Sequence, residues 1–241
     1  GNDVLVGGAW GLASGFAGDD LLVGRGVAGS LDGGEGNDIL VARGGNGSYN
    51  GGGGDDVYFF NAGDGGHAYI SEWSWPSPDG GTDTLSLGGG ITPDSVTAAL
   101  EVMDWGDGTE YRTLHLHIGG SSQTIEVNWT TSYTDWSGVP VVEDYRVEHI
   151  QFVTDSGVQV FDLAALVADR AADLEAAFNA GTDVALFGPE SAAFDITAQT
   201  AVAGGEYARI YATTGTVPLV PIGEELPAPN RAPAVGSPVG D

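Results

Sequence analysis

A nine-residue repeat rich in glycine and aspartate, at the start of the chain, restricts the fold more than any other feature of the sequence. The pattern Gly-Gly-x-Gly-x-Asp-x-apolar-x is complete in two copies, at residues 33–41 and 51–59, and nearly complete in a third, at 15–23. The sequence begins inside a fourth copy, at residues 1–5. Degenerate copies at residues 24–32 and 42–50 keep the apolar position but have glycine in place of aspartate. A fixed period of this kind predicts a stack of similar units that bury a continuous core.

The apolar position of the repeat returns every nine residues without a slip, at Leu22, Leu31, Leu40, Tyr49 and Tyr58. Nine residues provide one glycine turn and one short strand, so two units should close one coil of about eighteen residues. Glycine suits such turns because they need positive φ angles and a close approach of backbones. The intact copies therefore all fall on one edge of the predicted stack.

The spacing of the aspartates on that edge matches the size of a calcium ion. Asp20, Asp38 and Asp56 follow one another at one-coil intervals, so their carboxylates should stack about 4.8 Å apart, the distance between neighbouring strands. Because calcium–oxygen bonds are about 2.4 Å long, an ion midway between two carboxylates could bind both. Without an ion the carboxylates repel by roughly 1 kcal/mol in water-like surroundings, and more at lower dielectric. The sequence thus predicts Ca²⁺ sites and a fold that is unstable without them.

Composition narrows the functional classes further. The chain has 34 acidic residues against 7 basic ones and a net charge of −27, which makes nucleic acid an improbable partner. Cysteine is absent, so a metal must be held by oxygen rather than sulfur. We find no run of about 18 apolar residues, and expect no membrane span. The start of the sequence has the features of neither a signal peptide nor an initiation site, and we expect a piece of a longer protein.

Residues 1–60 resemble the repeats-in-toxin (RTX) group, the haemolysin-type calcium-binding repeats of bacterial proteins exported by type I secretion. The resemblance implies a parallel β-roll in which each ion takes the aspartate and two carbonyl oxygens from successive turns. One ion would use Phe16, Gly18, Asp20, Gly33, Glu35 and Asp38. The next would use Gly34, Gly36, Asp38, Gly51, Gly53 and Asp56. A third would use Gly1, Asp3, Gly15, Ala17 and Asp20.

The third set departs from the pattern, because its copies are seventeen rather than eighteen residues apart. The opposite edge of the roll departs more strongly, since Gly29 and Gly47 stand at the aspartate positions and offer no carboxylate. We therefore expect no ions along that edge.

We expect an all-β fold: an N-terminal parallel β-roll of RTX nonapeptide repeats (residues 1–70), followed by a β-rich capping region (71–165) with one α-helix. Helical spacing over 162–179 predicts that helix, with Asp162 as N-cap and Gly181 as its stop. Residues 166–226 comprise this helix and further strand-like sequence without a motif, and the proline-rich stretch 227–241 is expected to be a linker. The runs at residues 81–85, 90–96, 127–129 and 146–152 of the flank resemble the companion segment that caps the roll in RTX proteins. Residues 230–235 resemble the start of cadherin-like or immunoglobulin-like modules in giant RTX surface proteins.

These observations favour a calcium-binding structural and secretion-coupling module of a large, secreted or cell-surface, adhesin-like bacterial protein. It would pass through the type I secretion machinery unfolded and fold on Ca²⁺ outside the cell. We find no catalytic motif and expect no enzyme activity in this chain. Two alternatives stay open: the non-catalytic tail of a secreted hydrolase (protease, lipase or polysaccharide lyase), and a module that binds surface glycans through Trp129 and Trp136.

Overall fold

Two mixed β-sheets make up most of the protein. The computed structural model describes residues 1–8, 11–25, 28–44, 46–73 and 81–219. The first sheet has, in spatial order, β1 (Val4–Val6), β3 (Leu21–Val23), β5 (Ile39–Val41), β7 (Val57–Asn61), β9 (Thr84–Gly88), β14 (His149–Thr154) and β15 (Gly157–Asp162). The second has β16 (Val184–Ala185), β10 (Val96–Asp104), β11 (Glu110–Ile118), β12 (Thr124–Thr134), β8 (His67–Ile70), β6 (Asn46–Gly53), β4 (Ala28–Glu35) and β2 (Leu12–Ala17), with β13 (Pro140–Asp144) paired to β12. The β-rich class expected from the sequence is confirmed.

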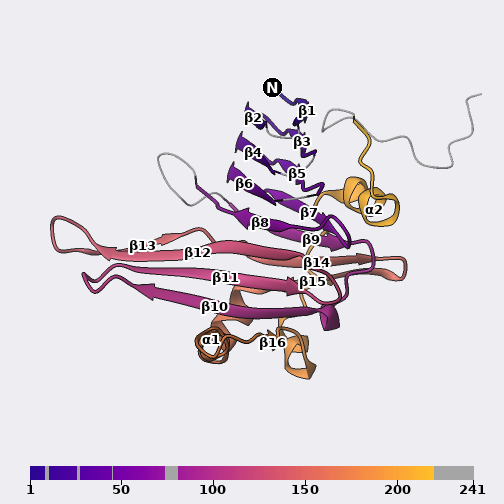
Figure 1. Cartoon of the computed structure of the whole chain (residues 1–241). Helices are drawn as coiled ribbons and strands as arrows, with labels where there is room; N and C mark the ends of the chain where they lie inside the picture. The colour runs from indigo at the N-terminus through magenta and orange to yellow at the C-terminus, as the bar shows by residue number, and fades with distance from the viewer. Residues whose placement is uncertain (9–10, 26–27, 45, 74–80, 220–241) are drawn as a thin grey trace, which may run out of the picture.

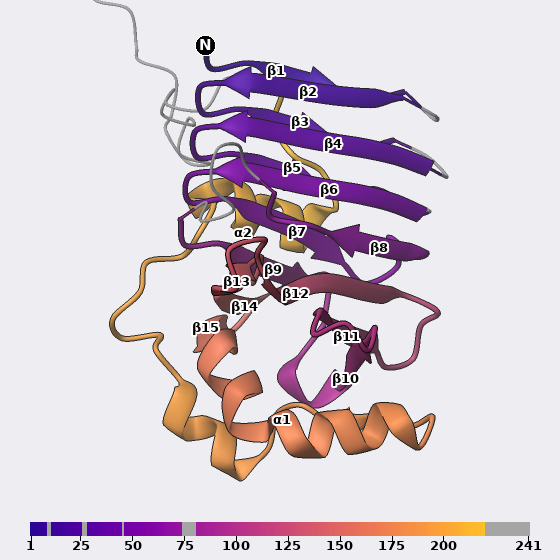
Figure 2. The ribbon, with the colours of Figure 1, turned by 90° about the vertical axis from the view of Figure 1, so that its left-hand side faces the viewer.

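The repeat segment alternates between the two sheets. Each strand from β3 to β7 pairs in parallel with the strand two before it in the chain. Leu21 pairs with Ile39 and Ile39 pairs with Val57, which is the eighteen-residue step of the repeat, whereas Val4 pairs with Leu21 at a step of seventeen. Successive coils consequently lie one above another (Figure 2).

The apolar positions of the repeat lie between the two sheets. Leu22, Leu31, Leu40, Tyr49 and Tyr58 are all buried and belong to one hydrophobic cluster. The cluster continues into the flank through residues of β10, β11, β12 and β14. Burial of this row is the main source of stability for strands of three to eight residues, which would not persist in isolation.

Both sheets continue from the repeats into the flank without interruption. β8 pairs in parallel with β6 on one side and β12 on the other. β9 in the same way pairs with β7 and β14. The end of the stacked coils is therefore covered by strands of the flank, as Figure 1 shows.

The predicted helix is present as α1 (Leu163–Asn179), at the end of the molecule opposite the first coil (Figure 2). The Asp162 carboxylate accepts a 2.8 Å hydrogen bond from the Ala165 amide and caps the helix. Gly181 has a φ of 66°, a left-handed conformation suited to ending a helix. Leu166 and Leu174 are buried in the main core. Two 3₁₀ helices, η1 (Pro93–Ser95) and η2 (Pro189–Phe194), complete this part.

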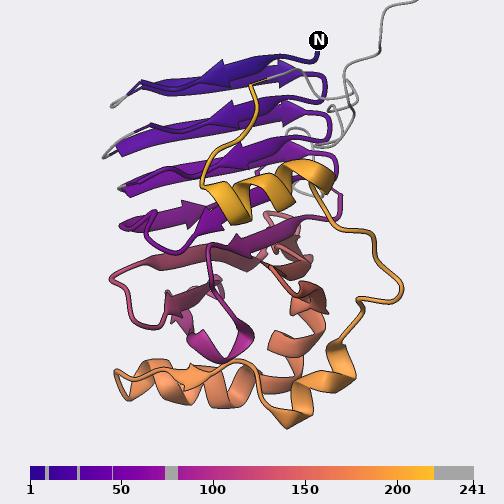
Figure 3. The ribbon, with the colours of Figure 1, turned by 90° about the vertical axis from the view of Figure 1, so that its right-hand side faces the viewer.

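The expectation of a single α-helix is wrong, because residues 205–214 form a second helix, α2 (Gly205–Thr214). In the described part of the strand-like sequence after α1, only Val184–Ala185 forms a strand, β16. The sequence after α1 was interpreted as strand-like, but the buried residues Tyr207, Ala208 and Tyr211 have helical spacing. The Tyr211 ring stacks on Phe59, with centroids 5.8 Å apart. As Figure 3 shows, α2 covers the outer face of the first sheet. The proposed linker at 227–241 lies outside the described residues.

Candidate metal centre

Three aspartates of the repeat form a buried ladder along one edge of the coils. The side chains of Asp20, Asp38 and Asp56 are each 0% exposed. In each, one carboxylate oxygen, Oδ1, accepts a hydrogen bond from the backbone one coil earlier: Asp3 N to Asp20 (2.6 Å), Asp20 N to Asp38 (2.7 Å) and Asp38 N to Asp56 (2.7 Å). These bonds fix the orientation of every carboxylate and leave its second oxygen free for another ligand.

The second oxygens are the unusual feature of the site. Oδ2 of Asp20, Asp38 and Asp56 is buried and has no hydrogen-bond partner among the described residues. A buried polar atom without a partner is costly, more so if it is charged. The donor set suits a hard divalent cation such as Ca²⁺, which prefers carboxylate and carbonyl oxygens.

Carbonyl oxygens converge on the same points as the free carboxylate oxygens. A β-carbon at position 15 would collide with Oδ2 of Asp20 and would lie 2.6 Å from the carbonyl oxygen of Gly33. One coil later, a β-carbon at position 33 would likewise collide with Oδ2 of Asp38 and would lie 2.6 Å from the carbonyl oxygen of Gly51. Glycine at these positions thus opens a space lined by oxygen atoms, and both carbonyls belong to the ligand sets expected from the sequence.

The remaining expected carbonyl ligands of the first two sets lie at the ends of β2, β4 and β6 and in the turns that follow, where several residues have left-handed backbone. Gly18, Gly34 and Gly36 have φ angles of 120°, 111° and 129°, and Phe16 has a φ of 71°, uncommon for a residue with a bulky side chain. The carbonyl oxygens of Glu35 and Gly53 accept hydrogen bonds from Gly18 N (2.8 Å) and Gly36 N (2.7 Å). Because a carbonyl oxygen has two lone pairs, such a bond leaves one available to a metal.

The third expected ligand set differs from the other two. The Gly1 nitrogen donates a 2.5 Å hydrogen bond to the Ala17 carbonyl oxygen. Asp3 is exposed, unlike the three aspartates that follow it in the ladder. Its carboxylate therefore lacks the buried setting that makes the other members of the ladder good candidates for ligands.

Burial gives the ladder an unusual affinity for protons. It raises the pKa of Asp38 to about 7 and that of Asp56 to about 9, and raises the pKa of Asp20 in the same direction. Nearby carboxylates add to these shifts, whereas the backbone hydrogen bonds oppose them. In the metal-free chain, protons consequently compensate for part of the buried negative charge at neutral pH.

Sequence reasoning missed the next member of the ladder, Asp83. The Asp56 amide donates a 2.9 Å hydrogen bond to Oδ1 of Asp83, although the two residues are 27 rather than 18 positions apart. Gly81 has a φ of 134°, close to the 126° of Gly54. The signal was present as Gly-x-Asp-x-Leu at 81–85, which repeats the second half of the motif after a longer interval.

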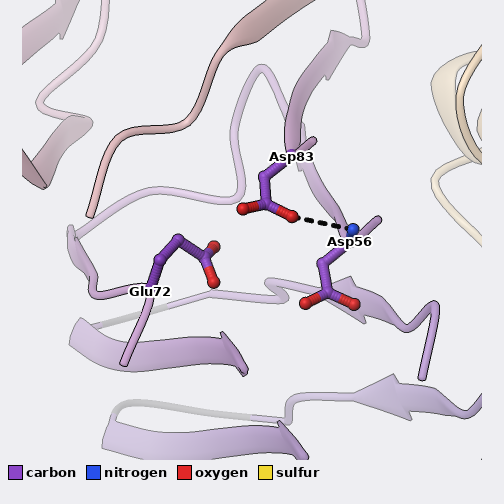
Figure 4. A group of neighbouring side chains, drawn as sticks. All are labelled: Asp56, Glu72 and Asp83. Atoms are coloured by element: carbon purple, nitrogen blue, oxygen red, sulfur yellow. Dashed lines mark hydrogen bonds between the residues drawn. The ribbon is translucent and has the colours of Figure 1, made fainter. Parts of the chain in front are cut away.

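Glu72 was also missed, and it meets the end of the ladder from outside the repeat. Asp56, Glu72 and Asp83 are all buried, and one carboxylate oxygen from each lies within 4.8 Å of the others. Figure 4 shows the three side chains converging on one another. No repeat position contributes Glu72, so the nine-residue pattern carried no signal for it.

The two tryptophans considered for glycan binding do not form one exposed platform. Trp129 is only 5% exposed and packs in the main core, so its ring cannot stack on a sugar. Trp136 is 98% exposed, beyond the end of β12. The expectation that both rings act together is wrong, because one of them supplies the apolar area that the flank buries.

A glycine substitution can test whether the oxygen-lined space matters. We expect Gly33→Ala to lower the free energy of unfolding in saturating calcium by about 1–3 kcal/mol, because the new methyl group would overlap Oδ2 of Asp38. Gly29→Ala is the matched control, since among the described residues its β-carbon would approach only the Gly11 carbonyl oxygen, at 3.6 Å. Urea denaturation of both variants measures the difference. Equal losses would show that the space next to Asp38 has no special role.

Comparisons with known proteins do not assign the chain to a family. No protein-family model matches the chain, and no curated protein is significantly similar to it. In the part of the chain that the structure describes, neither α1 nor α2 has the length and apolar character needed to cross a membrane.

Proposed function

We propose that this chain is a calcium-binding structural module whose repeat segment forms a parallel β-roll of the RTX type. The observation that carries the proposal is the row of three fully buried aspartates, each with one oriented oxygen and one oxygen that lacks a partner. A purely structural glycine turn would not need an acid at this position in every intact copy.

The residues fit the proposed ions in number and kind. Between the coils of Asp20 and Asp38, the ligands would be those two carboxylates with the carbonyl oxygens of Phe16, Gly18, Gly33 and Glu35. Between the coils of Asp38 and Asp56, they would be those carboxylates with the carbonyl oxygens of Gly34, Gly36, Gly51 and Gly53. Each set supplies six oxygens, the lower end of the usual calcium coordination number.

Calcium would act as the folding switch of the module. A ligand that binds only the folded state stabilises it by RT ln(1 + [L]/Kd), about 1.4 kcal/mol per site at ten times Kd. Two sites would contribute about 3 kcal/mol, a large share of the stability of a typical domain. With a net charge of −27, the chain also gains from neutralisation of its compact state.

This switch suits a part of a large exported, adhesin-like protein. The chain would stay unfolded at low cytosolic calcium, pass through a type I secretion machinery and fold outside the cell, where sites with Kd values of about 10⁻⁴–10⁻³ M would fill. The alternative, the non-catalytic tail of a secreted hydrolase, uses the same switch. The two differ in the sequence upstream of Gly1: a catalytic domain favours the tail, whereas further repeats or β-sandwich modules favour the adhesin.

Calorimetric titration of the calcium-free chain, with circular dichroism followed in parallel, tests the proposal. We expect at least two ions to bind as the β signal rises. A chain that is already fully folded without calcium, and that binds none at millimolar concentration, would overturn it.

A further inference from the structure

We propose that Asp56, Glu72 and Asp83 form a separate divalent-cation site at the junction between the repeats and the flank, with Glu72 as a ligand supplied from outside the repeat. This inference deepens the proposed function, because it assigns a distinct calcium site to the point where the coils meet their cap. The nonapeptide pattern does not specify such a site.

The geometry and chemistry of the three side chains support the assignment. Their closest carboxylate oxygens lie within 4.8 Å of one another, a separation that an ion with oxygen bonds of about 2.4 Å can bridge. Oδ2 of Asp56 is buried without a hydrogen-bond partner in the described part of the chain. The ligands are all carboxylates, which favours Ca²⁺ over transition metals that prefer nitrogen or sulfur.

The hydrogen bonds around the cluster do not neutralise its charge. Glu72 accepts hydrogen bonds from the Tyr58 hydroxyl group and, at 3.3 Å, from the Gly52 amide. These donors are neutral, and none of the ion pairs among the described residues includes Asp56, Glu72 or Asp83. Three buried carboxylates without a cationic partner therefore need protons or a metal.

The ligands belong to three segments that only the folded chain brings together. Asp56 immediately precedes β7, Glu72 follows β8, and Asp83 immediately precedes β9. The Asp83 amide donates a 2.9 Å hydrogen bond to Oε2 of Glu148, just before β14, which links the cluster to the flank. An ion bound here would stabilise the last coil and the cap at the same time.

Charge distinguishes this site from those between the repeats. It offers three carboxylates, whereas each proposed site between coils offers two. Because the charge of the ligands tunes calcium affinity, we expect the junction to bind more tightly than the sites of the ladder. Binding at low calcium would then begin at the cap and proceed towards the first coil.

The test uses the full chain and the variants Glu72→Gln, Asp83→Asn and their combination. The slope of the unfolding free energy against the logarithm of free calcium concentration counts the ions bound by the folded state. We expect each single variant to lose the tightest ion, or to weaken it by about tenfold or more. The double variant should lose no additional ion, because both side chains serve the same one. Asp155→Asn is the control, since it removes the same charge from an exposed turn between β14 and β15.

The outcomes separate this inference from the proposed function. If Glu72→Gln lowers stability equally at all calcium concentrations and leaves the slope unchanged, Glu72 has only a structural role and the junction site is wrong. If the junction variants lose an ion but Asp38→Ala does not, the junction site stands and the ladder fails. A wild-type slope of zero would overturn both.

Discussion

Replacing Asp38 with alanine should remove two calcium ions at once and leave the chain largely unfolded at calcium concentrations that fold the wild type. Its amide donates to Asp56 and its carboxylate accepts from Asp20, so Asp38 is the central member of the ladder. The loss of two ions corresponds to about 3 kcal/mol at ten times Kd. The variant also leaves the Asp20 amide without its acceptor, which adds to the loss.

Two further variants isolate the contribution of the metal. Asp38→Asn keeps an oxygen that can accept from the Asp20 amide but lacks the charge, so it should lose calcium affinity with a smaller loss of calcium-independent stability. Asp155→Ala removes an acidic side chain from an exposed turn between β14 and β15, and should bind as many ions as the wild type. Calorimetric stoichiometry and urea denaturation at several calcium concentrations provide the measurements. A full complement of ions in Asp38→Ala would contradict the ladder.

The sequence predicted the features that depend on its own period. The row of apolar residues from Leu22 to Tyr58 is buried between two sheets, and Asp20, Asp38 and Asp56 lie on one edge at the expected interval. Both results follow from the covalent repeat alone, because equal spacing in the chain becomes equal spacing in space once successive strands pair in parallel. Helix α1 was predictable for a similar reason, since its N-cap Asp162 and the apolar spacing after it are local signals.

What escaped prediction depends on contacts between distant segments. Glu72 and Asp83 join Asp56 only because β8 and β9 extend the two sheets into the flank. The position of helix α2 also depends on contacts between distant segments. Its tyrosines cover an apolar outer face of the repeats that includes Ile39 and Phe59. Apolar residues on both sides of the repeat's core position were a signal that something covers that face, but not which segment does so.

The calcium-free and calcium-bound proteins should respond to pH in opposite directions. Burial raises the pKa of Asp56 from 3.8 to about 9, and that of Asp83 from 3.8 to about 10, with neighbouring carboxylates adding to both shifts. The folded state thus binds more protons than the unfolded state between these values, so stability must fall as pH rises. The stability that these bound protons provide is fully present below pH 3.8, the pKa of both carboxyl groups in the unfolded chain. It is lost as pH rises through their raised pKa values in the folded state. We expect the calcium-free chain to be distinctly more stable at pH 5 than at pH 8.

Calcium should reverse this trend, because the carboxylates must release their protons before they can bind a metal. Affinity should therefore rise from pH 5 to pH 8, and calorimetry in buffers of different ionisation enthalpy should detect protons released with each ion. Asp56→Asn should flatten the pH dependence of the calcium-free chain, whereas Asp155→Asn, in an exposed turn, should not. If the calcium-free wild type were instead more stable at pH 8, the buried carboxylates would already be compensated by other groups. The ladder would then have no need of a cation.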